Sequence, residues 1–358
     1  MLDHNFIEAL RAEAQEFQRI FDAQREAATA ANQSPFPAPQ LEMEGENSLL
    51  LKYLSNAADM LRAPIEGIDN LVEPLLPRMG VAALVGTSDS GKSTFLRGLA
   101  MAIVEGRSEY VGFRLKPLHR RAIYVSTEDD AQSVAALMKR QIAELGTVEG
   151  EYEGLDFIFD TSDLIPTLDA ALTVRPADVV IVDAFADLYT GALNENNRVR
   201  GFLQQYHALA LRHNTLVLFL HHTSKRSEVL APSKHNAIGS QGFEAKMRLM
   251  MELRPDPERY DIRHLCVVKG NYLAAEYKHD SFELRFTEGL NYVATGERVP
   301  FELLRERDPE KEEASSEKLA LIRAMREEGK SLREIAAELG FKSHASIKHI
   351  LNKSLVNG

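Results

Sequence analysis

The chain has 358 residues, of which 44% are hydrophobic and 27% are charged, and its formal net charge is −11. This length allows a core domain of about 200 residues with smaller appendages. A single cysteine, Cys266, excludes an intrachain disulfide, and the negative charge argues against a general nonspecific affinity for nucleic acid. No window approaches a membrane span and the N-terminus lacks a signal-peptide core, so we expect a cytoplasmic protein with no membrane contact.

The first 63 residues indicate helices on a tether. Residues 3–28 place apolar side chains on one helical face, and the proline-bearing segment QSPFPAPQ follows. A second short helix is expected at 48–62. The residues on the first helical face are Phe6, Ile7, Leu10, Ala14, Phe17 and Phe21.

Residues 64–297 alternate apolar strands with helical stretches, which is typical of an α/β domain. Four of the first five strands are short, rich in β-branched residues and almost continuously apolar, as strands covered by helices on both faces should be. We therefore expect a parallel sheet, extended by antiparallel strands at 264–269 and 281–286. The first five strands are 81–86, 122–127, 155–159, 178–183 and 215–222.

The strongest chemical signal is GTSDSGKS, which satisfies the phosphate-loop pattern G-x-x-x-x-G-K-[ST], follows a strand and opens a helix. Its glycines allow backbone N–H groups to surround an anion, and the helix N-terminus adds its dipole. Lys92 would reach the outer phosphates and Ser93 would hold Mg²⁺, whereas the carboxylate of Asp89 must point outward. The expected nucleotide-binding residues are Gly86, Thr87, Ser88, Asp89, Ser90, Gly91, Lys92, Ser93 and Thr94.

Two carboxylates follow strands and could complete this site. Asp183 ends the strand DVVIVD and is the expected partner of the magnesium ion. Ala184 follows it where many phosphate-loop enzymes have a catalytic glutamate, so the carboxylate that orients water must come from elsewhere. Glu128, at the end of a neighbouring strand, is our choice. The alternative is that the run Glu128–Asp130 is a solvated turn that begins the next helix.

The charged segment 298–315 is interpreted as a linker, and residues 316–358 are expected to form three helices with helix-turn-helix spacing. From Gly340 onward there are three lysines, two histidines and no acid, so the positive charge falls on the expected recognition helix. Small three-helix units also serve as protein docking modules, and that alternative stays open. The expected DNA contacts in this domain are Lys342, Ser343, His344, Ser346 and Lys348.

The ordered set GTSDSGKS, YVSTEDD, VVIVDAFADLY, LVLFLHHTSK and AIGSQGFEAKMR resembles the RepA-type branch of the RecA-like ATPases, the hexameric replicative helicases of plasmids and mobile elements. The resemblance implies a homo-oligomeric ring that uses ATP and Mg²⁺ and encloses single-stranded DNA. It also implies that Lys92 and Ser93 bind phosphate and magnesium, that Asp183 supports the metal and that Glu128 is catalytic. Arg248 matches the arginine that members of this branch insert into a neighbouring subunit's site.

The same resemblance makes one histidine of the pair His221 and His222 a sensor of the γ-phosphate. Their strand should end beside the Asp183 strand, and alternate side chains point to opposite faces, so only one of them can address the phosphate. We favour His222. A zinc site is not expected, because no cluster with ligand spacing accompanies the pair, but a plain core histidine is an alternative.

Two further assignments have alternatives in which the residues have no functional role. Lys225, Arg226 and Lys234 follow the histidines in a polar segment that would face the channel of a ring and contact DNA, or would simply be solvated. Arg248 could be a surface residue paired with Glu244, and Lys269 is the next choice for its role. For the whole chain, the alternatives to a helicase are an ATP-switched DNA-binding regulator or loader, and a small-molecule phosphotransferase.

Overall fold

The computed structural model describes residues 56–62, 64, 67–224, 227, 229–239, 241–305, 309–341, 344 and 347. The chain divides into two compact units, Met1–Gly67 and Ile68–Gly358. In the first unit the described part contains helix α3 (Ala57–Arg62). The helix expected at 3–28, and most of the one expected at 48–62, lie outside the described residues.

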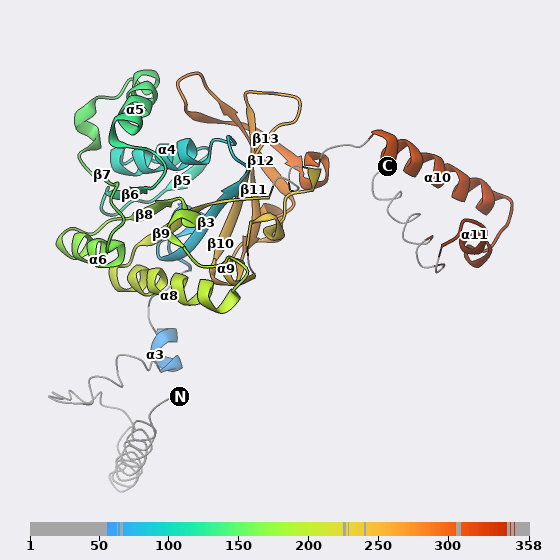
Figure 1. Ribbon diagram of the computed structural model, residues 1–358, viewed down its shortest axis with the longest axis horizontal. Coiled ribbons are helices and arrows are strands. Elements are labelled where there is room, and N and C mark those ends of the chain that lie inside the picture. Colours follow the sequence, from blue (N-terminus) through green and yellow to red (C-terminus); the bar gives the residue numbers. More distant parts are fainter. Residues whose placement is uncertain are drawn as a thin grey trace, which may run out of the picture. The chain divides into compact units, whose positions relative to one another are not determined.

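A nine-stranded sheet forms the centre of the second unit (Figure 1). Six neighbouring strands, β10, β3, β9, β8, β6 and β7, run parallel to one another. The strands β11, β12 and β13 extend the sheet beyond β10 by antiparallel pairing. This arrangement confirms the expected mixed α/β fold. In spatial order the strands are β13 (Tyr292–Pro300), β12 (Asp280–Phe286), β11 (Ile262–Gly270), β10 (Leu249–Pro255), β3 (Gly80–Gly86), β9 (Leu216–His222), β8 (Val179–Asp183), β6 (Ala122–Ser126) and β7 (Leu155–Ile158).

Each strand divides its side chains between two cores, because successive residues of a strand point to opposite faces. On β3, Ala82 and Leu84 belong to the core under helix α4 (Lys92–Glu105), whereas Val81, Ala83 and Val85 face the opposite core. That second core is closed by α6 (Leu164–Val174), α8 (Asn196–His213) and α9 (Gln241–Lys246). Helices α5 (Ala131–Leu145) and α7 (Phe185–Leu188) follow β6 and β8.

A small antiparallel sheet, in the order β2-β1-β5-β4, packs into the same core as α4. The sequence did not predict it, since two of its strands have only two residues. Its strands are β1 (Asn70–Glu73), β2 (Leu76–Pro77), β4 (Glu109–Tyr110) and β5 (Phe113–Leu115). Single 3₁₀ turns lie at η1 (Glu149–Tyr152), η3 (Lys234–Asn236), η4 (Ala275–Tyr277) and η5 (Phe301–Leu304).

The C-terminal segment contains α10 (Pro309–Glu327) and α11 (Leu332–Glu338). The segment 298–315, expected to be a linker, includes the end of β13, which continues to Pro300. It also includes the first turns of α10, which begins at Pro309, because a proline suits the first position of a helix. Ser331 and Glu334 form a capping box at the start of α11. Most residues of the expected third helix lie outside the described part. Within that part, no helix is long and apolar enough to cross a membrane.

Candidate functional site

The phosphate-loop residues form a tight connection between β3 and α4. Gly91 has φ 92°, a left-handed conformation that favours glycine, and Asp89 has φ 60°. A Cβ atom at Gly86 would lie 2.4 Å from the carbonyl oxygen of Leu253, so glycine is required there as well. The side chain of Asp89 is exposed. The carboxylate of Asp89 therefore points outward, as expected, and does not pack against the backbone N–H groups at the start of α4.

Lys92 is buried, with 4% of its surface exposed, and its Nζ donates a hydrogen bond to the carbonyl oxygen of Thr87 at 2.6 Å. Burial lowers the pKa of Lys92, while the negative charges of Asp183, Glu128 and Asp89 oppose that shift. Within the described part of the chain, this hydrogen bond pairs the Lys92 ammonium with a neutral carbonyl group rather than with a carboxylate. A buried ammonium in this state would be stabilised by an anion.

Asp183 ends β8 and is also buried. Its Oδ2 accepts a hydrogen bond from the hydroxyl of Tyr124 at 2.6 Å, whereas its Oδ1 has no hydrogen-bond partner in the described part of the chain. Burial raises the pKa of Asp183, and interactions with the hydroxyls of Tyr124 and Ser93 oppose the rise. An unpartnered carboxylate oxygen beside a serine hydroxyl fits a hydrated Mg²⁺ ion, which prefers oxygen ligands.

Mg²⁺ would need further ligands at this place. No group of three or more His, Cys, Asp or Glu side chains in the described residues could hold a metal ion by itself. The phosphates of a nucleotide supply such ligands in many magnesium sites. The residues present therefore fit a metal that arrives with a nucleotide.

Glu128 and His222 face each other across the same edge of the sheet. His222 Nε2 lies 3.5 Å from Oε1 of Glu128, and both side chains are partly exposed. The N-cap of α5 is Asp130, whose carboxylate accepts hydrogen bonds from the backbone of Gln132 and Ser133. Glu128 is therefore not the residue that caps this helix.

The other histidine of the pair, His221, is buried with 1% of its surface exposed, and its Nε2 lies 2.7 Å from the carbonyl oxygen of Ile238. Burial lowers the pKa of His221 to about 4, so its ring is neutral at physiological pH. His221 is therefore a core histidine, whereas His222 lies at the edge of the candidate site.

These groups gather at one edge because β3, β9, β8 and β6 are parallel neighbours whose carboxyl ends coincide. Sequence reasoning missed Tyr124, which lies inside the apolar strand β6 and holds Asp183. It also missed Thr127, whose hydroxyl donates to Asp187 at 2.5 Å and lies 3.0 Å from the carbonyl oxygen of Asp183. A polar residue within an otherwise apolar strand was the available signal.

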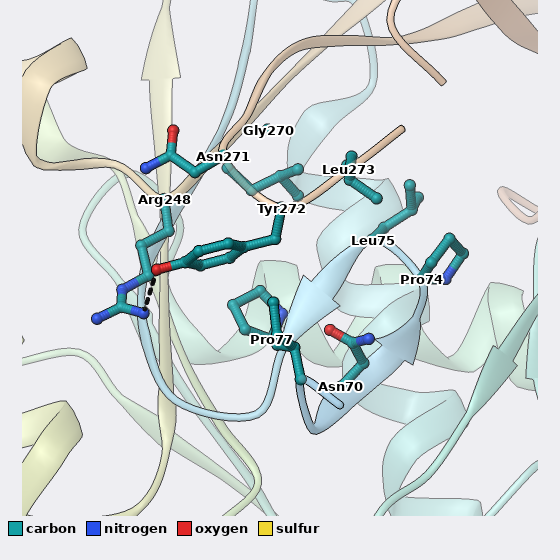
Figure 2. A pocket seen from close by; sticks show the side chains of 11 residues that line it. Asn70, Pro74, Leu75, Pro77, Arg248, Gly270, Asn271, Tyr272 and Leu273 are labelled. Carbon is teal, nitrogen blue, oxygen red and sulfur yellow. Dashed lines mark hydrogen bonds between the residues drawn. The ribbon is translucent and has the colours of Figure 1, made fainter. Parts of the chain in front are cut away.

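Arg248 lies at the opposite edge of the sheet. It precedes β10, whose Leu249 pairs with Ala82 near the start of β3, whereas the phosphate loop follows the end of β3. Its Nη1 lies 3.3 Å from the hydroxyl of Tyr272, beside a pocket of about 240 Å³ (Figure 2). Arg248 therefore cannot reach the phosphate loop of its own chain.

The alternative pairing of Arg248 with Glu244 does not occur. Glu244 instead binds Lys234 at 2.8 Å and lies 3.4 Å from His235 Nδ1. Lys269, the next choice for the role of Arg248, donates to the backbone carbonyl of Glu244 at 2.6 Å.

The expected DNA contacts are only partly described. Lys234 is paired with Glu244, and its side chain is 41% exposed. In the C-terminal segment His344 is exposed. The remaining expected contacts, Lys225, Arg226, Lys342, Ser343, Ser346 and Lys348, lie outside the described residues.

A glycine-containing loop at a helix N-terminus, with a buried aspartate at the end of a nearby strand, defines a phosphate-loop nucleotide-binding ATPase. The family model described as an AAA domain matches residues 48–228, and the chain belongs to this family. Its fold is similar to that of a solved ATPase domain of another protein, with a TM-score of 0.51 and 12% sequence identity. The alignment covers 70% of this chain and 99% of that one. No curated protein matches the sequence.

Proposed function

We propose that this protein is an ATP-dependent DNA helicase or translocase of the RepA-like hexameric type, acting in the cytoplasm in the replication or transfer of plasmid or mobile-element DNA. The observation that carries the proposal is the convergence of Lys92, Asp183 and Glu128 at one sheet edge, with Oδ1 of Asp183 buried and unpartnered among the described residues. A binding loop alone would not need a second, partly exposed carboxylate beside it.

Each residue has a role that follows from its surroundings. Lys92 and the backbone N–H groups at the start of α4 bind the phosphates of ATP. Ser93 and Asp183 hold Mg²⁺, which neutralises charge on the phosphates when bound. Glu128, which is partly exposed, accepts a hydrogen bond from the attacking water and orients it. His222, 3.5 Å from that carboxylate, senses whether the terminal phosphate is present.

The position of Arg248 supports the proposed ring. The seven residues of β3 extend about 23 Å, so Arg248 and the phosphate loop lie at opposite ends of one subunit. Repetition of the same contact around a closed ring would place each arginine at the next subunit's nucleotide. There it would stabilise charge that develops on the phosphates during hydrolysis.

DNA contact is proposed for the segment after β9 and for the C-terminal domain. The segment after β9 is tied to the site, because Ile238 N donates to the carbonyl oxygen of His222 at 2.9 Å and Thr223 forms a bridge with Ala237. A change at His222 can therefore alter the position of this loop. The basic residues Lys225, Arg226 and Lys234 would follow the phosphates of a single strand.

The test is ATP turnover with and without single-stranded DNA. A helicase or translocase requires strong stimulation by DNA. A slow rate that ignores DNA would favour the alternative, an ATP-switched DNA-binding regulator or loader. A rate that depends on a small metabolite would favour a phosphotransferase. The mass of the protein with a nonhydrolysable ATP analogue would test the hexamer.

A further inference from the structure

The antiparallel extension of the sheet touches the phosphate loop directly. Tyr292 on β13 donates from its hydroxyl to the carbonyl oxygen of Gly91 at 3.1 Å. Arg263 on β11 donates from Nε to the carbonyl oxygen of Ser90 at 3.2 Å. Strands that lie beyond β10 are therefore in contact with the loop that would hold the phosphates.

Arg263 also fixes the hairpin between β10 and β11. Its Nη1 donates to the carbonyl oxygens of Tyr260 and Ile262, both at 2.8 Å. Because one planar guanidinium group contacts all of these atoms, the carbonyl oxygens of Ser90 and Tyr260 lie within about 8 Å of each other. The hairpin is thus held beside the phosphate loop, at the edge of the sheet where the parallel strands β3 and β10 end.

Asp256 makes this hairpin rigid. Its Oδ1 accepts hydrogen bonds from the backbone N–H groups of Glu258 and Arg259, and its Oδ2 contacts the Arg259 guanidinium and Nε2 of His264. Arg259 also binds Glu283 on β12 at 2.6 Å. Burial alone would raise the pKa of Asp256, but the hydrogen bonds from Arg259 and His264 hold that pKa well below its usual range, so the carboxylate stays ionised.

This rigid hairpin displays Tyr260, whose surface is 91% exposed. Among the described residues it is the most exposed of the large apolar or aromatic side chains. An aromatic ring held in water by a fixed backbone gains nothing for the fold, because it buries almost no surface. Such a ring is suited to contact a flat partner.

The direction of a bound nucleotide identifies that partner. Glu128, Asp183 and His222, which would surround the terminal phosphate, lie on the β9 side of the phosphate loop, whereas the hairpin lies on the β10 side. A nucleotide with its terminal phosphate on the first side extends its ribose and base toward the second. We propose that Tyr260 is the stacking platform for the nucleobase, a subsite that rests on the proposed ATPase function and accounts for binding of the base.

Stacking recognises the face of a base rather than its edge, and every base has such a face. The platform therefore contributes affinity with little discrimination among bases. Tyr260→Ala should weaken the affinity for ATP by about 5- to 150-fold, the range that base–aromatic stacking provides. Tyr260→Phe keeps the ring and should stay within about twofold of the wild type.

The decisive comparison uses ribose 5′-triphosphate, which has the phosphates and the sugar but no base. Its dissociation constant, measured by calorimetry on the full chain with Mg²⁺, should be the same for the wild type and for Tyr260→Ala. Phe159→Ala removes another exposed ring, on the strand β7 side of the sheet, and should leave both affinities unchanged. The mass of each variant, with and without ATP, should equal that of the wild type.

Three results would overturn the assignment. These are undiminished ATP affinity in Tyr260→Ala, an equal loss for ribose 5′-triphosphate, and loss of subunit assembly in place of base affinity, which would make Tyr260 a subunit contact. If the wild type bound neither ligand, the proposed ATPase function would fail together with the subsite. If the wild type bound ATP and the alanine variant bound it equally well, only the subsite would fail.

Discussion

Nε2 of His222 lies 3.5 Å from Oε1 of Glu128, across the edge of the sheet where β9 and β6 end. In the proposed mechanism, this contact joins the histidine that senses the terminal phosphate to the carboxylate that orients the attacking water. It exists because β8 alone separates the two strands and all three run in the same direction.

The first prediction concerns this carboxylate. Glu128→Gln keeps the shape of the side chain but removes its negative charge, so ATP binding should persist while turnover falls about 10²-fold or more. Lys92→Ala should weaken both binding and turnover, because it removes the buried ammonium at the phosphates. The two variants are distinguished by measuring nucleotide affinity and steady-state hydrolysis separately.

Asp129 provides the matched control for Glu128. Asp129 directly follows Glu128 in the chain, and its side chain is exposed. Its backbone carbonyl, not its carboxylate, accepts a hydrogen bond from the hydroxyl of Ser126. Asp129→Asn should therefore hydrolyse ATP at close to the wild-type rate. Unchanged turnover in Glu128→Gln would show that another group orients the water, and the role assigned to Glu128 would be wrong.

The second prediction concerns the C-terminal domain. Arg254 donates to the carbonyl oxygen of Leu304 at 2.8 Å, so the ATPase domain extends at least to that residue. A chain that ends at Asp308 keeps this contact and removes α10 and everything after it. We expect basal ATP hydrolysis to be retained and duplex DNA binding, measured by anisotropy, to fall. Duplex binding as tight as that of the full chain would identify the domain as a docking module.

The third prediction uses the buried histidine. The pKa of His221 is lowered from 6.5 to about 4 by burial, so below pH 6.5 the unfolded chain takes up a proton that the folded chain does not. His221 thus favours the folded state fully above pH 6.5, and this contribution is lost as the pH falls toward 4. From pH 7.5 to pH 5.0 the loss should be about 2 kcal/mol.

Urea unfolding of the wild type and of His221→Gln at both pH values tests this expectation. The glutamine has no charge at either pH, so its free energy of unfolding should fall by about 2 kcal/mol less than that of the wild type. Equal losses in wild type and His221→Gln would mean that His221 is not the titrating group.

The sequence predicted the parts of this fold that have strong local signals. The apolar strands β3, β6, β7, β8 and β9 were located to within a residue or two, because strands buried on both faces are almost continuously apolar. The phosphate loop was recognised from its glycines and lysine. The strands β2 and β4 were not predicted, since two residues carry no periodicity.

The contacts that complete the site could not be predicted from local sequence patterns, because their residues are far apart in the chain. Arg263 and Ser90 are 173 residues apart, and Tyr292 and Gly91 are 201 residues apart. Only the order of strands in the sheet brings them together. Similarly, the placement of Arg248 at the opposite edge depends on β10 pairing in parallel with β3, which no residue near Arg248 indicates.

The last prediction tests whether Arg248 acts on a neighbouring subunit. Arg248→Ala and Lys92→Ala should each be nearly inactive alone, the first because it lacks the arginine and the second because it lacks a working phosphate loop. In mixed rings, some interfaces join an intact phosphate loop to an intact arginine from the next subunit. Those interfaces should recover hydrolysis, which can be followed as a function of the mixing ratio.

Lys246→Ala is the control for the region around Arg248, because Lys246 contacts Gln204 through its side chain and lies on α9, just before β10. Lys246→Ala should hydrolyse ATP when it is alone. In a mixture with an inactive variant, the hydrolysis rate should rise only in proportion to the amount of Lys246→Ala added. Mass measurements must show that rings contain both variants. If such mixed rings recover no hydrolysis, Arg248 does not act across the subunit boundary, and its contact with Tyr272 at 3.3 Å becomes the better account of the side chain.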